Sequence, residues 1–282
     1  LSLQRLLARA CEIEVHEVRS TLASFGLVLI LMGSYYILRP VRDAMASDWS
    51  DAEVSWLWTF TFICSTFAVW LYGAAVAHVS IRRLVPSVYG LFAASFGLFY
   101  LGTQTLSHPV LLDKAFYIWV SLFSLFHISV FWSFMADTFS RPQATRLFGF
   151  IGAGASTGAI IGPTLAALLV DDIGTDALLL VAAGSIALAP PLIIWLQDLK
   201  YSDLNNEAHS AGAAAFDNIG GGALAGFSEF LKSNYLLVIG LFLFLYTSIG
   251  SFVYFGQKNL LEVYDIETRS QILAGMDLVV NI

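Results

Sequence analysis

Charged residues are scarce in this sequence. They make up 12% of its 282 residues, against about 25% in a typical soluble domain. Hydrophobic residues make up 57%, and the mean hydropathy is +0.74. A soluble fold of this composition would expose apolar patches large enough to cause aggregation. The composition therefore argues against a soluble enzyme and against a disordered chain.

Basic residues are scarcer than acidic ones, and cysteine is nearly absent. The 14 Lys and Arg face 21 Asp and Glu, a formal charge of −7, which disfavours nucleic acid as a partner. Cys11 and Cys64 lie in very different surroundings, so no disulfide framework is implied. The sequence has no His-Glu-x-x-His pattern and no pair of Asp inside an apolar run long enough to cross a membrane. The Gly-x-Ser-x-Gly spacing at 154–158 falls within such a run and not at the strand-to-helix turn that a nucleophile elbow needs. We therefore expect neither an enzyme nor a cofactor or metal site.

Long apolar runs recur along the chain. A bilayer core about 30 Å thick takes about 20 helical residues. The runs of suitable length are 21–45, 56–76, 84–101, 112–135, 147–170, 177–195 and 235–255. An eighth begins near Ile272 and continues to the last residue, and the first residue is Leu1 and not Met, so we expect a piece of a longer protein. The runs predict an all-α polytopic protein embedded in a lipid bilayer.

The connections between these runs predict topology and domains. With the N-terminus in the cytoplasm, nine Lys and Arg lie in cytoplasmic segments and five on the other side, as the distribution of basic residues in membrane proteins requires. Six helices before a long connection are typical of a transporter built from two six-helix halves. The domains we expect are a lead-in over 1–20, a six-helix bundle over 21–197, a cytoplasmic linker over 198–234 and the start of a second bundle over 235–282. The lead-in is either an amphipathic helix on the membrane surface or an ordinary helical approach to the first span.

The first span carries two charged residues that a bilayer should not tolerate. Tyr35, Arg39 and Arg42 are spaced i, i+4, i+7 and share one helical face, and Tyr36 lies beside them. A charge at the bilayer centre costs about 2.5–3.5 kcal/mol, so such residues are expected to face a polar cavity. A cavity with two arginines could bind an anion. The alternative is a helix that ends near Leu38, with both arginines reaching the headgroups.

Three further polar residues are candidates for the same site. His127 lies inside the fourth span, where it could bind substrate, carry a proton or serve only as a hydrogen-bonded packing residue. In the seventh span a polar run contains Tyr254 and leads to Lys258. Lys258 follows the start of its span by about as many residues as Arg42 follows its own. It is therefore either a third cation of the site or a lysine reaching the headgroups.

Small residues form a stripe in the fifth span. Gly154, Gly158 and Gly162 recur every four residues, which permits close approach of helix backbones. The fuller pattern is Gly149, Gly158, Gly162-Pro163 and Ala166-Ala167, which resembles the antiporter motif of the major facilitator superfamily. The resemblance implies a role in helix packing and gating. The loop before the third span is also similar to that superfamily in its Arg82-Arg83 pair, which is expected either to take part in gating or only to fix the orientation in the membrane. The loop has Ala77 in place of the usual Asp of the gating network.

Several stretches resemble one branch of this superfamily, the ATP/ADP-type nucleotide exchange transporters and their bacterial relatives. They are Glu17-Val18-Arg19, 35–43 (YYILRPVRD), 131–134 (FWSF) and 146–155 (RLFGFIGAGA). In that branch a basic residue before the Asp of the first-span stretch belongs to the exchange site, and Arg42 matches it. The branch also has an acidic residue early in the fourth helix, where this chain has Val120.

This resemblance implies a secondary transporter of the bacterial inner membrane that works by alternating access. We expect it to exchange a small anionic solute, such as a nucleotide. The residues expected to bind the solute are Tyr35, Tyr36, Arg39, Arg42, His127, Tyr254 and Lys258. The alternative left open is a degenerate transporter fold that serves only as a membrane anchor or scaffold.

Overall fold

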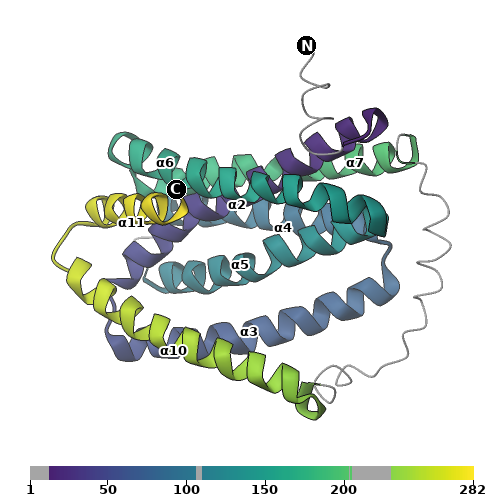
Figure 1. Ribbon diagram of the computed structural model, residues 1–282. Coiled ribbons are helices and arrows are strands. Elements are labelled where there is room, and N and C mark those ends of the chain that lie inside the picture. Colours follow the sequence, from purple (N-terminus) through teal and green to yellow (C-terminus); the bar gives the residue numbers. More distant parts are fainter. Residues whose placement is uncertain (1–12, 106–109, 203, 205–229) are drawn as a thin grey trace.

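The computed structural model describes residues 13–105, 110–202, 204 and 230–282, and within these ranges the chain is helical with no strand. A short 3₁₀ turn, η1 (Val15–Glu17), leads into the helices (Figure 1). The helices are α2 (Val18–Ala46), α3 (Asp51–His78), α4 (Ile81–Thr105), α5 (Val110–Thr138), α6 (Arg141–Ala187), α7 (Ala189–Ser202), α10 (Asn234–Leu261) and α11 (Ile266–Asn281).

Six helical segments in the described ranges are long and apolar enough to cross a membrane. One of them, Arg141–Lys200, has 60 residues, about 90 Å at 1.5 Å per residue and three times the thickness of a bilayer core. The backbone breaks at Gly174, where φ is 78° and ψ is 165°. Only glycine adopts this conformation readily. The chain reverses there, so the segment crosses twice, and the all-α polytopic fold expected from the sequence is confirmed.

The helices are longer than the apolar runs that predict them. The fifth and sixth predicted spans are both parts of the helical segment around Gly174, and the sixth continues through a turn at Leu188 into α7. Helix α7 extends to Ser202, so the first residues of the expected linker are helical. Most of that linker, and residues 1–12 of the expected lead-in, lie outside the described residues. The described end of the lead-in is η1, which passes directly into α2.

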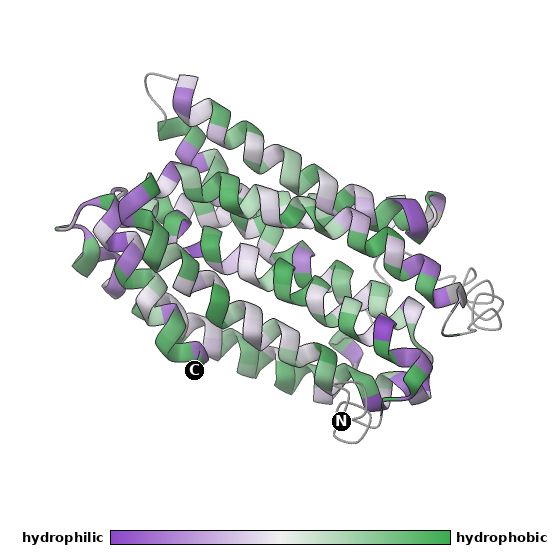
Figure 2. Ribbon diagram, turned by 90° about the horizontal axis from the view of Figure 1, so that it is seen from above, coloured by the Kyte–Doolittle hydropathy of each residue, from purple (hydrophilic) through white to green (hydrophobic). Residues whose placement is uncertain are grey.

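Helix α2 lies at the centre of the bundle. It packs against α5, α6, α7 and α11, and its buried face includes Leu27, Leu31 and Leu38. Hydrophobic residues cover the lengths of the helices, and hydrophilic residues gather at the two ends of the bundle (Figure 2). This distribution is what a bilayer demands, because lipid contacts the sides of the helices and water contacts their ends.

The bundle has two polar ends, called the Asp51 end and the Arg82 end after residues that lie there. The Asp51 end holds the turn between α2 and α3, the break at Gly174 and the turn between α10 and α11. The Arg82 end holds the turn between α3 and α4 and the end of α7. The C-terminal part of α10 contacts the bundle at the Asp51 end, where Lys258 and Leu261 are buried. The N-terminal part of α10 is exposed, with Val238 and Phe242 about two-thirds accessible.

Candidate functional site

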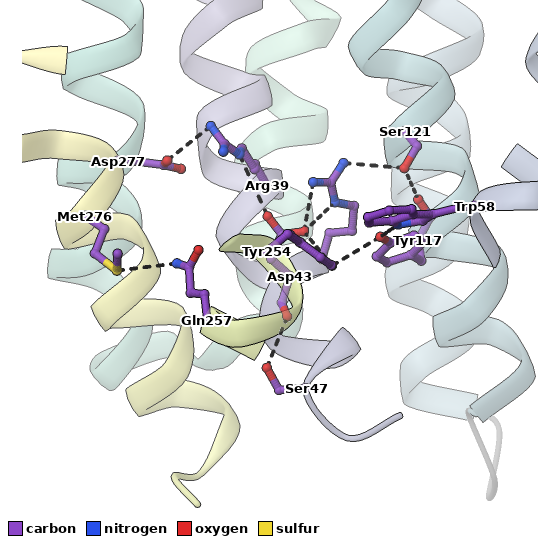
Figure 3. A network of polar contacts seen from close by, with 11 residues as sticks. Arg39, Asp43, Ser47, Trp58, Tyr117, Ser121, Tyr254, Gln257, Met276 and Asp277 are labelled. Carbon is purple, nitrogen blue, oxygen red and sulfur yellow. Dashed lines mark hydrogen bonds and ion pairs between the residues drawn. The ribbon is translucent and has the colours of Figure 1, made fainter. Parts of the chain in front are cut away.

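The two arginines of α2 point between helices. The helix does not end near Leu38. It continues through Pro40 to Ala46, so the alternative of an early helix end is wrong. Arg39 faces α11 (Figure 3). Arg42 faces α5, where its Nη1 donates to Ser121 Oγ at 3.4 Å and its guanidinium lies 5.4 Å from the centre of the Tyr117 ring. Only 13% of the Arg42 side chain is exposed.

Each arginine pairs with a carboxylate. Arg42 donates through Nη2 and Nε to Asp43 Oδ1, at 2.8 and 2.9 Å. Arg39 lies 3.1 Å from Asp277 Oδ1 on α11 and 3.8 Å from Asp43 Oδ2, one helical turn away on α2. Charges in a weakly polar interior are stable only when paired in this way. The four charges sum to zero, and the Arg39–Asp277 pair joins α2 to α11.

Three aromatic side chains close one side of this cluster. Trp58 on α3 donates its indole N–H to the Tyr117 hydroxyl at 2.8 Å, and the hydroxyls of Tyr117 and Tyr254 lie 3.1 Å apart. The Tyr254 hydroxyl also lies 3.5 Å from Asp43 Oδ1. The resulting chain of contacts connects α3, α5, α10 and α2, with the charged pair of α2 at its end (Figure 3).

Two cavities meet at Arg39 and Tyr254. The smaller, of about 200 Å³, lies between α2, α10 and α11 and is lined by Tyr36, Arg39, Asp43, Lys258, Asp277 and Asn281 among others. The larger, of about 750 Å³, lies between α2, α3, α5 and α10 and is lined by Arg39, Arg42, Trp58, Tyr117, Ser121 and Tyr254 among others. Cavities of this size suit a small molecule, and both place arginine side chains against it.

Lys258 reaches the rim of the smaller cavity, but its ammonium group points elsewhere. Its Nζ donates to the Trp49 carbonyl at 2.6 Å and lies 3.1 Å from Asp51 Oδ1. These contacts tie α10 to the turn between α2 and α3. Arg269, near the start of α11, ties that helix to the end of α2 and the turn after it. It contacts Asp48 at 2.5 Å and the Ala44 carbonyl at 3.4 Å.

His127 and Tyr35 lie together, away from the lining of both cavities. The two rings stack with centroids 4.9 Å apart. His127 is buried, with Nδ1 3.0 Å from the Phe123 carbonyl and Nε2 3.3 Å from Met32 Sδ. These contacts are those of a hydrogen-bonded packing residue, the alternative expected for His127. Tyr35 packs against this ring one helical turn before Arg39.

The glycine stripe of α6 lies directly against α2. A Cβ atom at Gly154 would come within 2.5 Å of the Phe25 carbonyl oxygen, and one at Gly158 would come equally close to the Leu29 carbonyl. Gly162, which precedes Pro163, meets the Gly33 carbonyl in the same way. Gly149, by contrast, faces open space. The three crowded glycines therefore allow two backbones to touch just behind the face of α2 that carries the arginines.

The Arg82-Arg83 pair lies at the opposite end of the bundle from Lys258. Arg82 lies 3.3 Å from Asp198 on α7, and Gln197 donates to the Arg82 carbonyl at 3.2 Å. The Arg83 backbone N–H caps the start of α4 by donating to the Ser80 carbonyl. The Arg82–Asp198 pair is more than half exposed, so solvent weakens it.

Sequence reasoning missed the acidic half of the cluster. Asp43 follows Arg39 by four residues on one helix, and this i, i+4 spacing predicts a pair. Asp277 is an acidic residue within the last apolar run of the sequence, and an acidic residue in such a run is a signal that marks a functional position by itself. Tyr117 and Ser121 carry no comparable signal, because polar residues of their kind are common in spans.

The fold and the cluster together define a class of protein. A bundle of membrane-crossing helices that holds buried, paired charges beside cavities between its helices is typical of a polytopic membrane transporter. A profile of the Major Facilitator Superfamily matches residues 24–279, and the chain belongs to this superfamily of secondary membrane transporters. Comparison with curated proteins and with solved structures gives no significant match.

Proposed function

We propose that this transporter binds a solute with an anionic group between Arg39 and Arg42 and moves it by alternating access. The observation that carries the proposal is the position of Arg42, which is nearly buried, lies inside a continuous helix and lines a cavity shared with Arg39. Arginine offers several donors in a planar fork that matches carboxylate and phosphate groups. The hydroxyls of Tyr36 and Tyr254 line the smaller cavity beside Arg39 and supply further contacts.

Alternating access explains the arrangement around the cluster. Contacts of α10 and α11 with α2 and α3 close the site at the Asp51 end, while the N-terminal part of α10 stands apart from the bundle. Rocking of α10 and α11 against the six-helix bundle would open the site at one end as it closes at the other. The glycine contact between α2 and α6 would keep the arginines in place during this motion.

Nucleotide exchange remains the finer candidate for the solute and the mode of transport. It rests on the resemblance of Arg42 and its neighbours to the exchange site of ATP/ADP-type transporters. Val120, at the position where that branch has an acidic residue, is fully buried. We further propose a bacterial inner-membrane location with the N-terminus in the cytoplasm, since most of the Lys and Arg that the structure describes lie at the Arg82 end.

Uptake into liposomes tests these proposals. The full chain is reconstituted, and uptake of labelled ATP and of small anions is measured with and without the same solute inside. We expect Arg42→Gln and Arg39→Gln to reduce uptake at least tenfold, while Arg82→Gln, at the far end, changes it less than twofold. Uptake that survives both substitutions would place the site elsewhere. Uptake of another anion that depends on the arginines, without ATP counterflow, would rule out nucleotide exchange but leave the anion site in place.

A further inference from the structure

The charges that line the two cavities balance. Apart from Lys258, whose ammonium group is held by Trp49 and Asp51, the charged residues of both linings are Arg39, Arg42, Asp43 and Asp277. Two guanidinium groups thus face two carboxylates. A site that binds a purely anionic solute would be expected to hold an excess of positive charge, and among the described residues the two linings taken together hold none.

The Arg42–Asp43 ion pair is held firmly together. Its partners are neighbours on one helix, they share two short contacts, and 13% and 10% of their side chains are exposed. The Arg39–Asp277 pair differs in each respect. It joins two helices through one contact of 3.1 Å, and 37% of the Arg39 side chain is exposed. Arg39 also lines both cavities. The Arg39–Asp277 ion pair is therefore the one that a solute can break.

Opening this pair with an anion alone would leave Asp277 without a counter-ion. The Asp277 side chain is 15% exposed, and Asp43, its nearest acidic neighbour in the cavity lining, would repel it. Such a buried, unpaired charge is strongly unfavourable. A solute that brings its own positive group avoids this penalty, because it replaces one ion pair with two and leaves the net charge of the site unchanged.

We infer that the solute is zwitterionic, with its anionic group on Arg39 and its cationic group on Asp277. This inference rests on the proposed function, which it narrows. The Tyr36 and Tyr254 rings line the same cavity and can contact a cation with their faces. The Tyr36 hydroxyl also lies 3.5 Å from Asn281 Oδ1, which brings two uncharged polar groups to the same wall. The volume of about 200 Å³ suits a solute of amino-acid size.

Matched solutes test the inference. Each pair consists of a zwitterion and an anion of nearly equal shape, in which a hydroxyl replaces the ammonium group: taurine with isethionate, and 4-aminobutyrate with 4-hydroxybutyrate. The full chain is reconstituted into liposomes, and binding is measured by ligand-dependent thermal stabilisation and by uptake. We expect the zwitterion to act at a concentration at least tenfold lower than its anionic partner in at least one pair. Equal action in both pairs, or no action by any of the four solutes, would overturn the inference.

Variants assign the preference to Asp277. Asp277→Asn should reduce the preference for the zwitterion to less than threefold and leave anion binding unchanged or stronger. The matched control is Asp171→Ala, which removes another polar contact of α11, the 2.9 Å bond that Gln271 donates to the Asp171 carboxylate, and should preserve the preference. A control that loses the preference equally would show that Asp277 acts only by holding α11 in place.

Two other results separate this inference from the proposed function. Anion binding that depends on Arg39 and Arg42 but shows no preference for zwitterions contradicts the inference and leaves the proposed function standing. The same holds for anion uptake that carries a proton inward, because Asp277 would then be neutralised by protonation. Binding that is unaffected by Arg39→Gln and Arg42→Gln contradicts the proposed function itself.

Discussion

Arg42 and Asp43 show how adjacent residues can place a charge inside an apolar bundle. Their side chains leave α2 in neighbouring directions and meet at two short contacts. Ser121 and the Tyr117 ring take up the remaining face of the guanidinium group. The charge of Arg42 is therefore neutralised by a residue of the same helix, and the surrounding helices need supply only weaker polar contacts.

We expect Arg42→Gln to lower the free energy of unfolding by about 3 kcal/mol, because it leaves the Asp43 carboxylate buried without its main partner. The double variant Arg42→Gln/Asp43→Asn should recover at least half of that loss, since it removes the unpaired charge. Unfolding of the purified protein in mixed micelles measures both values. Arg82→Gln is the control, and its exposed pair with Asp198 should cost less than about 1 kcal/mol. A double variant no more stable than the single one would contradict this account.

At the scale of elements, the contact between α2 and α6 decides the geometry of the site. Backbone carbonyls of α2 lie where Cβ atoms of α6 would otherwise be. Backbone cannot move aside as a flexible side chain can, so a methyl group here must push the helices apart. The arginines lie on α2 within a few residues of this contact, and a shift of α2 would move them relative to α5 and α11.

We expect Gly158→Ala to destabilise the protein by about 2–3 kcal/mol, the upper part of the range for an overpacked contact. Gly149→Ala is the matched control on the same helix. It meets no atom within 4 Å, so the better helix propensity of alanine should make it neutral or stabilising by up to about 1 kcal/mol. Equal losses for the two variants, measured by unfolding in micelles, would show that the stripe does not set the helix spacing.

The helices themselves could be predicted from the sequence because apolar length is a local property. The same holds for the placement of Arg39 and Arg42 on one face and for the Gly154–Gly162 stripe. The partner of Lys258 could not be predicted, since Asp51 is 207 positions away in the chain, and only the packing of α10 brings them together. The pairing of Asp277 with Arg39 could not be predicted for the same reason, although an acidic residue in an apolar run is itself a signal. His127 has two polar contacts within reach of its ring, Phe123 and Met32, and nothing in its local sequence distinguishes packing from binding.

At the scale of the whole molecule, polar ties hold the Asp51 end closed. Lys258 and Arg269 are both nearly buried. Lys258 binds Asp51, the first residue of α3, and Arg269 binds Asp48 in the turn between α2 and α3. Lys114 at the same end pairs with Glu53 at 2.7 Å, but this pair joins α5 to α3 within the six-helix bundle. The first two ties must break if α10 and α11 move, and the third need not.

We expect Lys258→Gln to favour the state that is open at the Asp51 end. Loss of about 1–2 kcal/mol from the closed state changes the ratio of the two states by a factor of about 5–30. A cysteine at Ser47, which lines the smaller cavity and is buried, reports this change through its labelling rate with a membrane-impermeant maleimide, after Cys11→Ser and Cys64→Ser. Lys114→Gln is the control and should leave the rate within twofold. Equal acceleration by both substitutions would contradict a specific role for Lys258.

The placement of Asp43 on the same helix as both arginines also bears on biosynthesis. A ribosome delivers α2 to the membrane before α5, α10 and α11 exist, so Ser121, Tyr254 and Asp277 cannot yet help. Each bare charge would add to the cost of partitioning the segment into lipid, up to about 2.5–3.5 kcal/mol for a charge at the bilayer centre. Asp43 reaches both guanidinium groups from within α2, so the stretch from Arg39 to Asp43 enters the bilayer with one net positive charge instead of two.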